Sequence, residues 1–274
     1  MHTGKYTGIG LIGNENIAAI YAVNNGIPDI NGTGIYHLFY KDYSHDLIQS
    51  AVTMIKAGDA IYYGNKVWRE ETHPRHIRPK KTYVEDHYRY CDEFSLDDMG
   101  LYRTEKVYAY GEHRLVFETE IENRSERQQE ICIYGYAAIR NTRRVAVEET
   151  GRDFVCVHTG NAYVGMYVSV GKETYMVDDS PTDFAYQTFL DILDGRQNTE
   201  IRETGCRLGY ARGGKVILAP KASQKVFWTL VIADSKEELA EELHGVRAAD
   251  LRAEAADYWH RWMEEGSIPK TDLF

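Results

Sequence analysis

One segment of the sequence, residues 34–48 (GIYHLFYKDYSHDLI), combines side chains that could bind a sugar. It places aromatic rings beside ionisable groups, namely Tyr36, His37, Tyr40, Asp42 and Tyr43. Aromatic rings stack on the C–H faces of a sugar, while Asp and His hydrogen-bond its hydroxyl groups. The same residue types also suit strand positions that pack on another domain or on a loop, and this second interpretation is favoured. These five residues, with Trp68, are therefore candidates for a sugar-binding or interdomain surface.

Other motifs give little support for a metal ion or a cofactor. His73 and His76 have a His-x-x-His spacing, but they lie in a Pro-flanked segment without an obvious third ligand. Residues 8–13 fit Gly-x-Gly-x-x-Gly, yet a strand follows where a dinucleotide site needs a helix. No P-loop, G-x-S-x-G or H-E-x-x-H sequence occurs. We therefore expect no metal site and no cofactor.

Carboxylate pairs are the usual machinery of glycoside hydrolysis, which needs two carboxyl groups across the scissile bond. Glu118, Glu120 and Glu122 share one face of a predicted strand. Acidic side chains that recur on the solvent-exposed face of a sheet are usually solvated, so this spacing does not indicate catalysis. We assign no catalytic residue from the sequence.

The charge balance excludes some classes of partner. Lys and Arg total 32 and Asp and Glu total 42, which gives a net charge of −10. Nucleic-acid binders and proteins that dock on anionic membranes usually carry a basic surface, so neither partner is expected. The four cysteines form no Cys-x-x-Cys pair, and the N-terminus lacks the apolar core of a signal peptide. These features predict a cytoplasmic protein with reduced thiols.

Alternation with a period of two residues predicts a mainly β protein. Residues 101–110 place Leu101, Arg103, Glu105, Val107 and Ala109 on one face. Together with the next two alternating runs, this segment predicts a three-stranded meander over 101–139. Further strands are predicted at 16–23, 34–40, 153–159, 162–170, 205–211, 215–219 and 224–233, with Gly213-Gly214 separating two of them. A dozen or more strands without βαβ alternation predict two stacked antiparallel sheets.

Helices are predicted only near the C-terminus, and the order of strands in 41–100 is not predicted. Ser235 followed by Glu238 is a capping box for a helix over about 236–244. A longer helix is predicted over 247–265, where apolar residues recur at three- and four-residue spacing.

The order of these elements resembles the N-terminal region of prokaryotic glucoamylase-type enzymes, glycoside hydrolase family 15. The features that carry the resemblance are Gly8–Asn14 followed by a strand, the aromatic segment 34–46, the strands around 101–139, and the closing helix with Tyr258, Trp259 and Trp262. In that family an antiparallel β-supersandwich, similar to the galactose mutarotase fold, precedes an (α/α)6 catalytic barrel. A helical linker joins the two.

The resemblance implies a sandwich domain over 1–234 and a helical linker over 235–274. The catalytic glutamates of that family lie in the barrel, so no catalytic residue is carried over to this chain. The implied function is that of a non-catalytic domain that packs on the catalytic barrel and shapes it. The implied carbohydrate partner is an α-glucan, which interacts with the chain as part of the parent enzyme.

Two alternatives remain open on the same fold. A free-standing sugar mutarotase or epimerase needs a His acid and a carboxylate base facing one ring. His37 or His158 could supply the acid, but no base is evident in the sequence. A carbohydrate-binding module is the other alternative.

Overall fold

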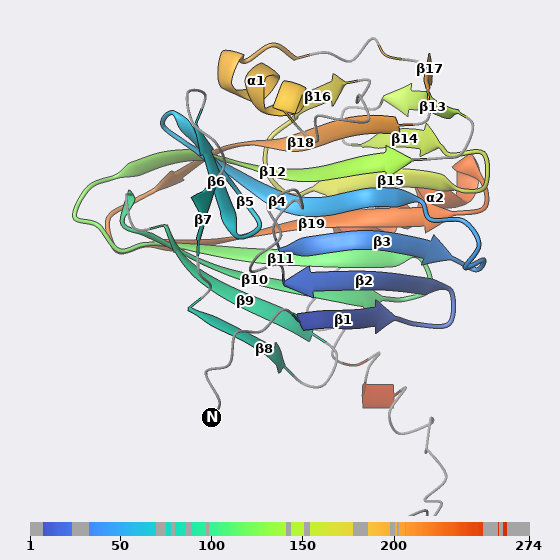
Figure 1. Cartoon of the computed structure of the whole chain (residues 1–274), viewed down its shortest axis with the longest axis horizontal. Coiled ribbons are helices and arrows are strands. Elements are labelled where there is room, and N and C mark those ends of the chain that lie inside the picture. The colour runs from blue at the N-terminus through green and yellow to red at the C-terminus, as the bar shows by residue number, and fades with distance from the viewer. Residues whose placement is uncertain are drawn as a thin grey trace, which may run out of the picture.

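The protein is described by a computed structural model as two stacked antiparallel β-sheets with two short helices (Figure 1). We name the sheet that contains the first strand sheet A and the other sheet B. The residues that the structure describes are 8–23, 33–69, 75–77, 80–85, 89–96, 99–140, 144–150, 154–177, 186–197, 201, 203–205, 207–248, 257, 260 and 261. The predicted class, a mainly β two-sheet sandwich, is confirmed.

Sheet A has the strand order β1-β2-β3-β4-β12-β18-β16, and β5, β6 and β7 extend from β4 as successive hairpin partners. Its strands are β1 (Gly8–Gly13), β2 (Ile17–Val23), β3 (Gly34–Tyr40), β4 (Ile48–Ala57), β5 (Ala60–Tyr63), β6 (Lys66–Arg69), β7 (Arg75–His76), β12 (Gln129–Arg140), β16 (Glu173–Val177) and β18 (Arg207–Leu218).

Sheet B has the strand order β17-β13-β14-β15-β19-β11-β10-β9-β8. Its strands are β8 (Lys81–Glu85), β9 (Arg89–Leu96), β10 (Leu101–Tyr110), β11 (Arg114–Asn123), β13 (Val145–Thr150), β14 (Val155–His158), β15 (Tyr163–Val168), β17 (Glu203–Thr204) and β19 (Ser223–Ala233). The segment 41–100, whose order was not predicted, therefore forms β4 to β9.

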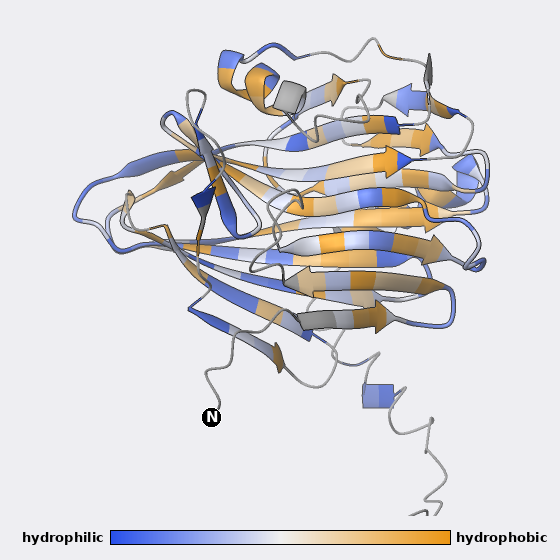
Figure 2. Ribbon diagram, viewed as in Figure 1, coloured by the Kyte–Doolittle hydropathy of each residue, from blue (hydrophilic) through white to orange (hydrophobic). Residues whose placement is uncertain are grey.

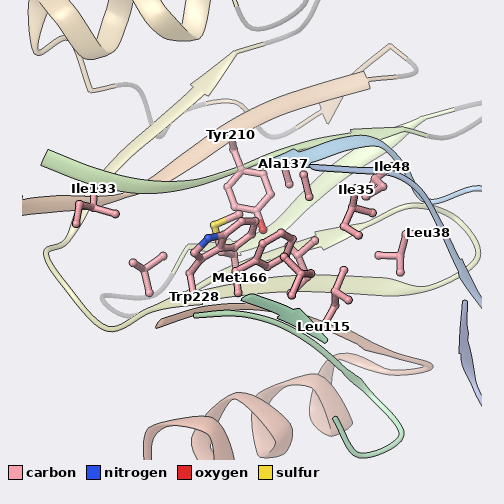
Figure 3. Packing of buried hydrophobic residues seen from close by; sticks show 14 of the residues in the cluster. Ile35, Leu38, Ile48, Leu115, Ile133, Ala137, Met166, Tyr210 and Trp228 are labelled. Carbon is pink, nitrogen blue, oxygen red and sulfur yellow. The ribbon is translucent and has the colours of Figure 1, made fainter. Parts of the chain in front are cut away.

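The main core lies between the two sheets. Trp228 of β19 is fully buried and stacks on Phe117 of β11, with ring centroids 3.7 Å apart. Gly135 of β12 lies against this indole, and a Cβ there would come within 2.6 Å of its ring carbons. Figure 3 shows Trp228 among the packed side chains of both sheets. Figure 2 shows hydrophobic and hydrophilic residues intermixed along the strands, as burial of one strand face requires.

Helix α2 (Lys236–Ala248) begins where the capping box predicts. The backbone N–H of Glu238 donates to Ser235 Oγ at 3.1 Å, which satisfies one of the free donors of the first turn. Leu239, Leu243 and Val246 are buried against the outer face of sheet B. The apolar face of the helix therefore packs on the sandwich itself.

Helix α1 (Tyr186–Asp194) was not predicted from the sequence. It covers part of the outer face of sheet A, the face that points away from sheet B. Phe189 of this helix packs on Tyr63 and Trp68 from β5 and β6, with ring centroids 4.7 and 5.7 Å away. Lys56 Nζ donates to the carbonyl oxygens of Ile192 and Leu193 at the C-terminal end of the helix.

The predicted meander over 101–139 is wrong in its third strand. β10 and β11 do pair, but β12 crosses to sheet A and pairs with β4 and β18. The buried Asn123 side chain fixes the crossing, since its amide donates to the carbonyl oxygens of Arg127, Leu218 and Ala219. Period-two alternation shows which face of a strand is buried. It does not show which sheet the strand joins, because strands of both sheets bury one face in the same core.

Gly213 and Gly214 do not separate two strands, because β18 runs unbroken through them. A Cβ on Gly213 would lie 1.9 Å from the carbonyl oxygen of Ile133, and one on Gly214 would lie 2.5 Å from the Cα of Gly171. These glycines therefore allow close approach of neighbouring backbones and do not mark a turn.

The predicted helix over 247–265 is described at only a few positions. Residues 247 and 248 end α2, and Asp257, His260 and Arg261 are helical. Tyr258, Trp259 and Trp262 lie outside the described residues, as does His73. Within the described residues no helix has the length and apolar character needed to cross a bilayer.

Candidate functional site

A β-bulge in β3 places two of the predicted site residues on one face. In the pairing with β2, Ile35 faces Tyr21 and His37 faces Ile20, so that Tyr36 is an extra residue. Ile35 points into the core between the sheets, whereas Tyr36 and His37 lie on the outer face of sheet A. Burial, with Tyr63 nearby, raises the pKa of Tyr36, so its phenol stays protonated at neutral pH.

Asp46 is the centre of a hydrogen-bonded cluster at the end of β3. Its Oδ2 lies 2.6 Å from His37 Nδ1 and accepts a hydrogen bond from Arg140 Nη2. Its Oδ1 accepts from the backbone N–H of Leu38 at 3.1 Å and of Ile48 at 3.4 Å. The Asp46 side chain is only 13% exposed, whereas that of His37 is 44% exposed. One buried carboxylate therefore orients an imidazole and a guanidinium that both reach the surface.

Two other predicted residues, Tyr40 and Trp68, are buried and lie apart from this cluster. Tyr40 points into the core, and its hydroxyl lies 3.1 Å from Nδ1 of His113 in the turn between β10 and β11. Burial raises the pKa of this phenol. Trp68 is buried beneath α1, as described above, and does not reach the surface.

Asp42 and Tyr43 lie in the exposed turn after β3. Asp42 accepts hydrogen bonds from the backbone N–H and the hydroxyl of Ser44 and contacts His45, and these contacts lower the pKa of its carboxyl group to about 2. Tyr43 is 69% exposed, and its ring lies 6.1 Å from that of Phe39 on the outer face. Phe39 in turn stacks on His37 at 6.3 Å. An exposed aromatic row therefore leads from Tyr43 to the Asp46 cluster.

The role of Arg140 was missed by the sequence analysis. Arg140 is 94 residues from Asp46 in the sequence, and it arrives only because β12 crosses to sheet A beside β4. No local signal marks it. His158, the other candidate acid, lies on sheet B, where its ring stacks on Tyr163 at 4.4 Å, and it does not join His37.

This arrangement can exchange a proton and bind a polar group. When His37 donates through Nδ1 to Asp46, Nε2 is its other nitrogen, available as an acceptor in the neutral ring and as a donor in the protonated ring. Arg140 uses one nitrogen on Asp46 and has further N–H groups for a second acceptor. Within the described residues no three His, Cys, Asp or Glu side chains gather to hold a metal ion.

Comparisons with known proteins bear on the fold alone. No family model and no curated protein matches the sequence. A bacterial glucoamylase solved with acarbose aligns over 94% of this chain with a TM-score of 0.60 and 11% identity, and this chain spans 37% of its length. A putative aldose 1-epimerase from Escherichia coli K12 aligns over 83% of this chain and 99% of its own, with a TM-score of 0.53 and 7% identity.

A third structure, Slr1438 from Synechocystis sp. PCC 6803, aligns over 86% of this chain and 100% of its own, with a TM-score of 0.51 and 9% identity. The fold is therefore a galactose mutarotase-like sandwich, as the resemblance implied, found both within a larger glycosidase and in shorter proteins.

Proposed function

We propose that this chain is the β-sandwich domain of a glucan-hydrolysing enzyme of the glucoamylase type, and that it cleaves no glycosidic bond itself. The observation that carries the proposal is the alignment with the bacterial glucoamylase, which covers more of this chain at a higher TM-score than either shorter protein does. In this proposal residues 1–234 form the sandwich and 235–274 lead toward an (α/α)6 catalytic domain in cis. The proposed location is the cytoplasm, consistent with Cys91, Cys132 and Cys156 being thiols outside any disulfide.

The proposed contact with the helical domain includes the exposed end of the aromatic row. Tyr43 is one of few large hydrophobic side chains on the described surface, and Phe39 supports its ring. Exposed aromatic residues of this kind are typical of interface anchors. Packing there would help to shape the entrance to the catalytic site.

The test begins with the reading frame beyond the codon for Phe274. We expect it to continue into a long helical repeat region with spaced glutamates. The full gene product should then release glucose from maltooligosaccharides, and residues 1–274 alone should not. A stop codon directly after Phe274, or glucose release by the isolated chain, would overturn the proposal.

A second candidate function, sugar mutarotation, is favoured by one specific observation. His37 is oriented by Asp46 and is partly exposed, as a general acid or base must be. The test is the rate at which α-D-glucose equilibrates with its β anomer, followed by polarimetry. An active site at this position predicts acceleration that is lost in His37→Gln and kept in His45→Gln, a nearby exposed histidine. No acceleration by the unmodified chain excludes this function.

A further inference from the structure

We propose that the open edge of sheet A pairs with the same edge of a second copy of this chain. Strand β1 of each copy then lies antiparallel to β1 of the other, and the two sheets continue into one across a two-fold axis. The interface is formed by the backbone of β1 and by the side chain of Leu11. The inference does not depend on whether the chain belongs to a glucoamylase-type enzyme.

Strand β1 lacks the features that normally protect the edge of a sheet. It is the last strand on one side of sheet A, and among the described residues it pairs with β2 alone (Figure 1). Natural edge strands carry charged side chains, proline or a bulge, or are very short. The six residues of β1, GIGLIG, include no charge and no proline, and their register with β2 is unbroken. Such an edge can accept another strand.

The other terminal strands that the structure describes are better protected. β8 carries Lys81 and Glu85 at its two ends. β7 and β17 are only two residues long. β16 begins with Glu173 and packs against α1. Pairing with another strand is therefore expected at β1 and not at these edges.

The turn after β1 shows which backbone groups face the open edge. The backbone N–H of Asn14 donates to the carbonyl oxygen of Ile17 at 2.9 Å, so these two residues form a hydrogen-bonded pair of the ladder. Hydrogen-bonded and non-hydrogen-bonded pairs alternate along an antiparallel ladder. Counted back from this pair along the register, the N–H and C=O groups of Ile9, Leu11 and Gly13 point away from β2 and toward the open edge.

These three residues can all pair with a second copy of the strand in one register. A two-fold axis at Leu11 brings Leu11 opposite the same residue of the second copy, and it brings Ile9 of each copy opposite Gly13 of the other. Each such pair can exchange both of its N–H···O=C hydrogen bonds. A shift of the axis by one residue in either direction leaves one of the three opposite a residue outside β1. The edge is therefore self-complementary, which favours a second copy of this chain over an unrelated strand.

The side chain of Leu11 and the low charge around it suit this partner. Leu11 lies on the outer face and is 70% exposed, the highest value among the large hydrophobic side chains described. Opposite its own copy, it extends the apolar row that it forms with Ile20 of β2. Residues 8–23 contain a single charged residue, Glu15, on a chain that is 27% charged. Two copies therefore meet at this edge without placing like charges opposite each other, although each carries a net charge of −10.

The test is sedimentation velocity of the full chain at micromolar to millimolar concentrations, where we expect a reversible monomer–dimer equilibrium because small interfaces are weak. Leu11→Lys places like charges opposite each other in the dimer and alters an exposed side chain of the monomer, so it should weaken the dimer by about tenfold or more. The matched control is Ile217→Lys on β18, which alters a side chain that is 56% exposed away from this edge and should leave the dimer unchanged. A monomer at every concentration, or a dimer that Leu11→Lys does not weaken, would overturn the proposal.

Amide hydrogen exchange, resolved by residue, locates the contact on the backbone. The N–H groups of Leu11 and Gly13 should exchange more slowly as the protein concentration rises, because the second copy accepts hydrogen bonds from them. Those of Gly10 and Ile12 donate to β2 in the monomer and in the dimer, so they serve as the internal control. If Leu11 and Gly13 exchange at the same rate in monomer and dimer, the interface lies elsewhere and the proposed pairing is wrong.

Discussion

Replacement of Asp92 by Asn should make the protein more stable at alkaline pH. Asp92 of β9 is fully buried and lies opposite Glu105 of β10, while Thr82 Oγ1 donates to its Oδ1 at 2.9 Å. Burial raises the pKa of Asp92 to about 8 from an ordinary value of 3.8, with Arg103 acting in the opposite direction and Glu105 adding to the rise. The folded protein therefore keeps a proton on this carboxyl group at neutral pH.

The sign and size of the effect follow from proton linkage. Between pH 4 and pH 8 the unfolded chain has lost this proton and the folded chain has kept it, so the free energy of unfolding falls as the pH rises. Each pH unit costs about 1.4 kcal/mol, and the whole interval costs about 6 kcal/mol. Asn has nearly the shape of the protonated acid, can accept from Thr82 and does not titrate. The stability difference between Asp92→Asn and the unmodified protein should therefore widen over this interval and stay level above it.

The assay is urea unfolding followed by circular dichroism at pH 5, 6, 7, 8 and 9. Comparison of the two proteins at each pH cancels the groups that both share. The control is Asp59→Asn, which alters a side chain that is 79% exposed and should give a difference that is nearly independent of pH. A constant difference for Asp92→Asn as well would refute the reasoning, because it would mean that Asp92 titrates alike in both states.

Three further substitutions test the packing. Gly135→Ala should destabilise the fold by about 1–3 kcal/mol in urea unfolding, because its Cβ would overlap the Trp228 indole. An unchanged unfolding midpoint would show that the core rearranges to accommodate the methyl group. Thr53→Val removes the hydroxyl that accepts from Trp228 Nε1 at 2.8 Å, which should cost about 1–3 kcal/mol and shift the tryptophan emission. Ser235→Ala removes the cap of α2 and should cost about 1 kcal/mol in thermal unfolding, whereas Ser235→Asp should not.

The sequence predicts the buried face of a strand well, even where that face is charged. All five residues assigned to one face of 101–109 are buried, including Arg103 and Glu105. The alternation of the backbone places these two inside whatever their polarity, because the apolar residues on either side of them must be buried. Arg103 Nη2 then donates to the carbonyl oxygen of Gly64, a contact across the sandwich that the pattern could not specify.

The sequence does not predict which sheet a buried strand joins. β12 has the inward face expected of a third meander strand, yet it lies between β4 and β18. Its partner is decided by the crossing after Asn123, whose buried amide donates to carbonyl oxygens of its own turn and of the turn between β18 and β19. Helix α1 was also missed because it depends on a long-range contact, the packing of Phe189 on sheet A. Short helices gain little stability from local propensity, so the sequence around them gives a weak signal.

The candidate site depends on the same crossing, and this is why its composition could not be predicted. The aromatic and ionisable residues around His37 are evident in the sequence, but Tyr40 turns to the core and Trp68 is covered by α1. Only the bulge in β3 brings Tyr36 and His37 to one face, and only the path of β12 brings Arg140 to Asp46. If β12 had continued the meander on sheet B, Asp46 would lack its guanidinium partner. The local sequence therefore predicts the residues around His37. The long-range strand order, which the sequence pattern does not predict, brings the Arg140 guanidinium to them.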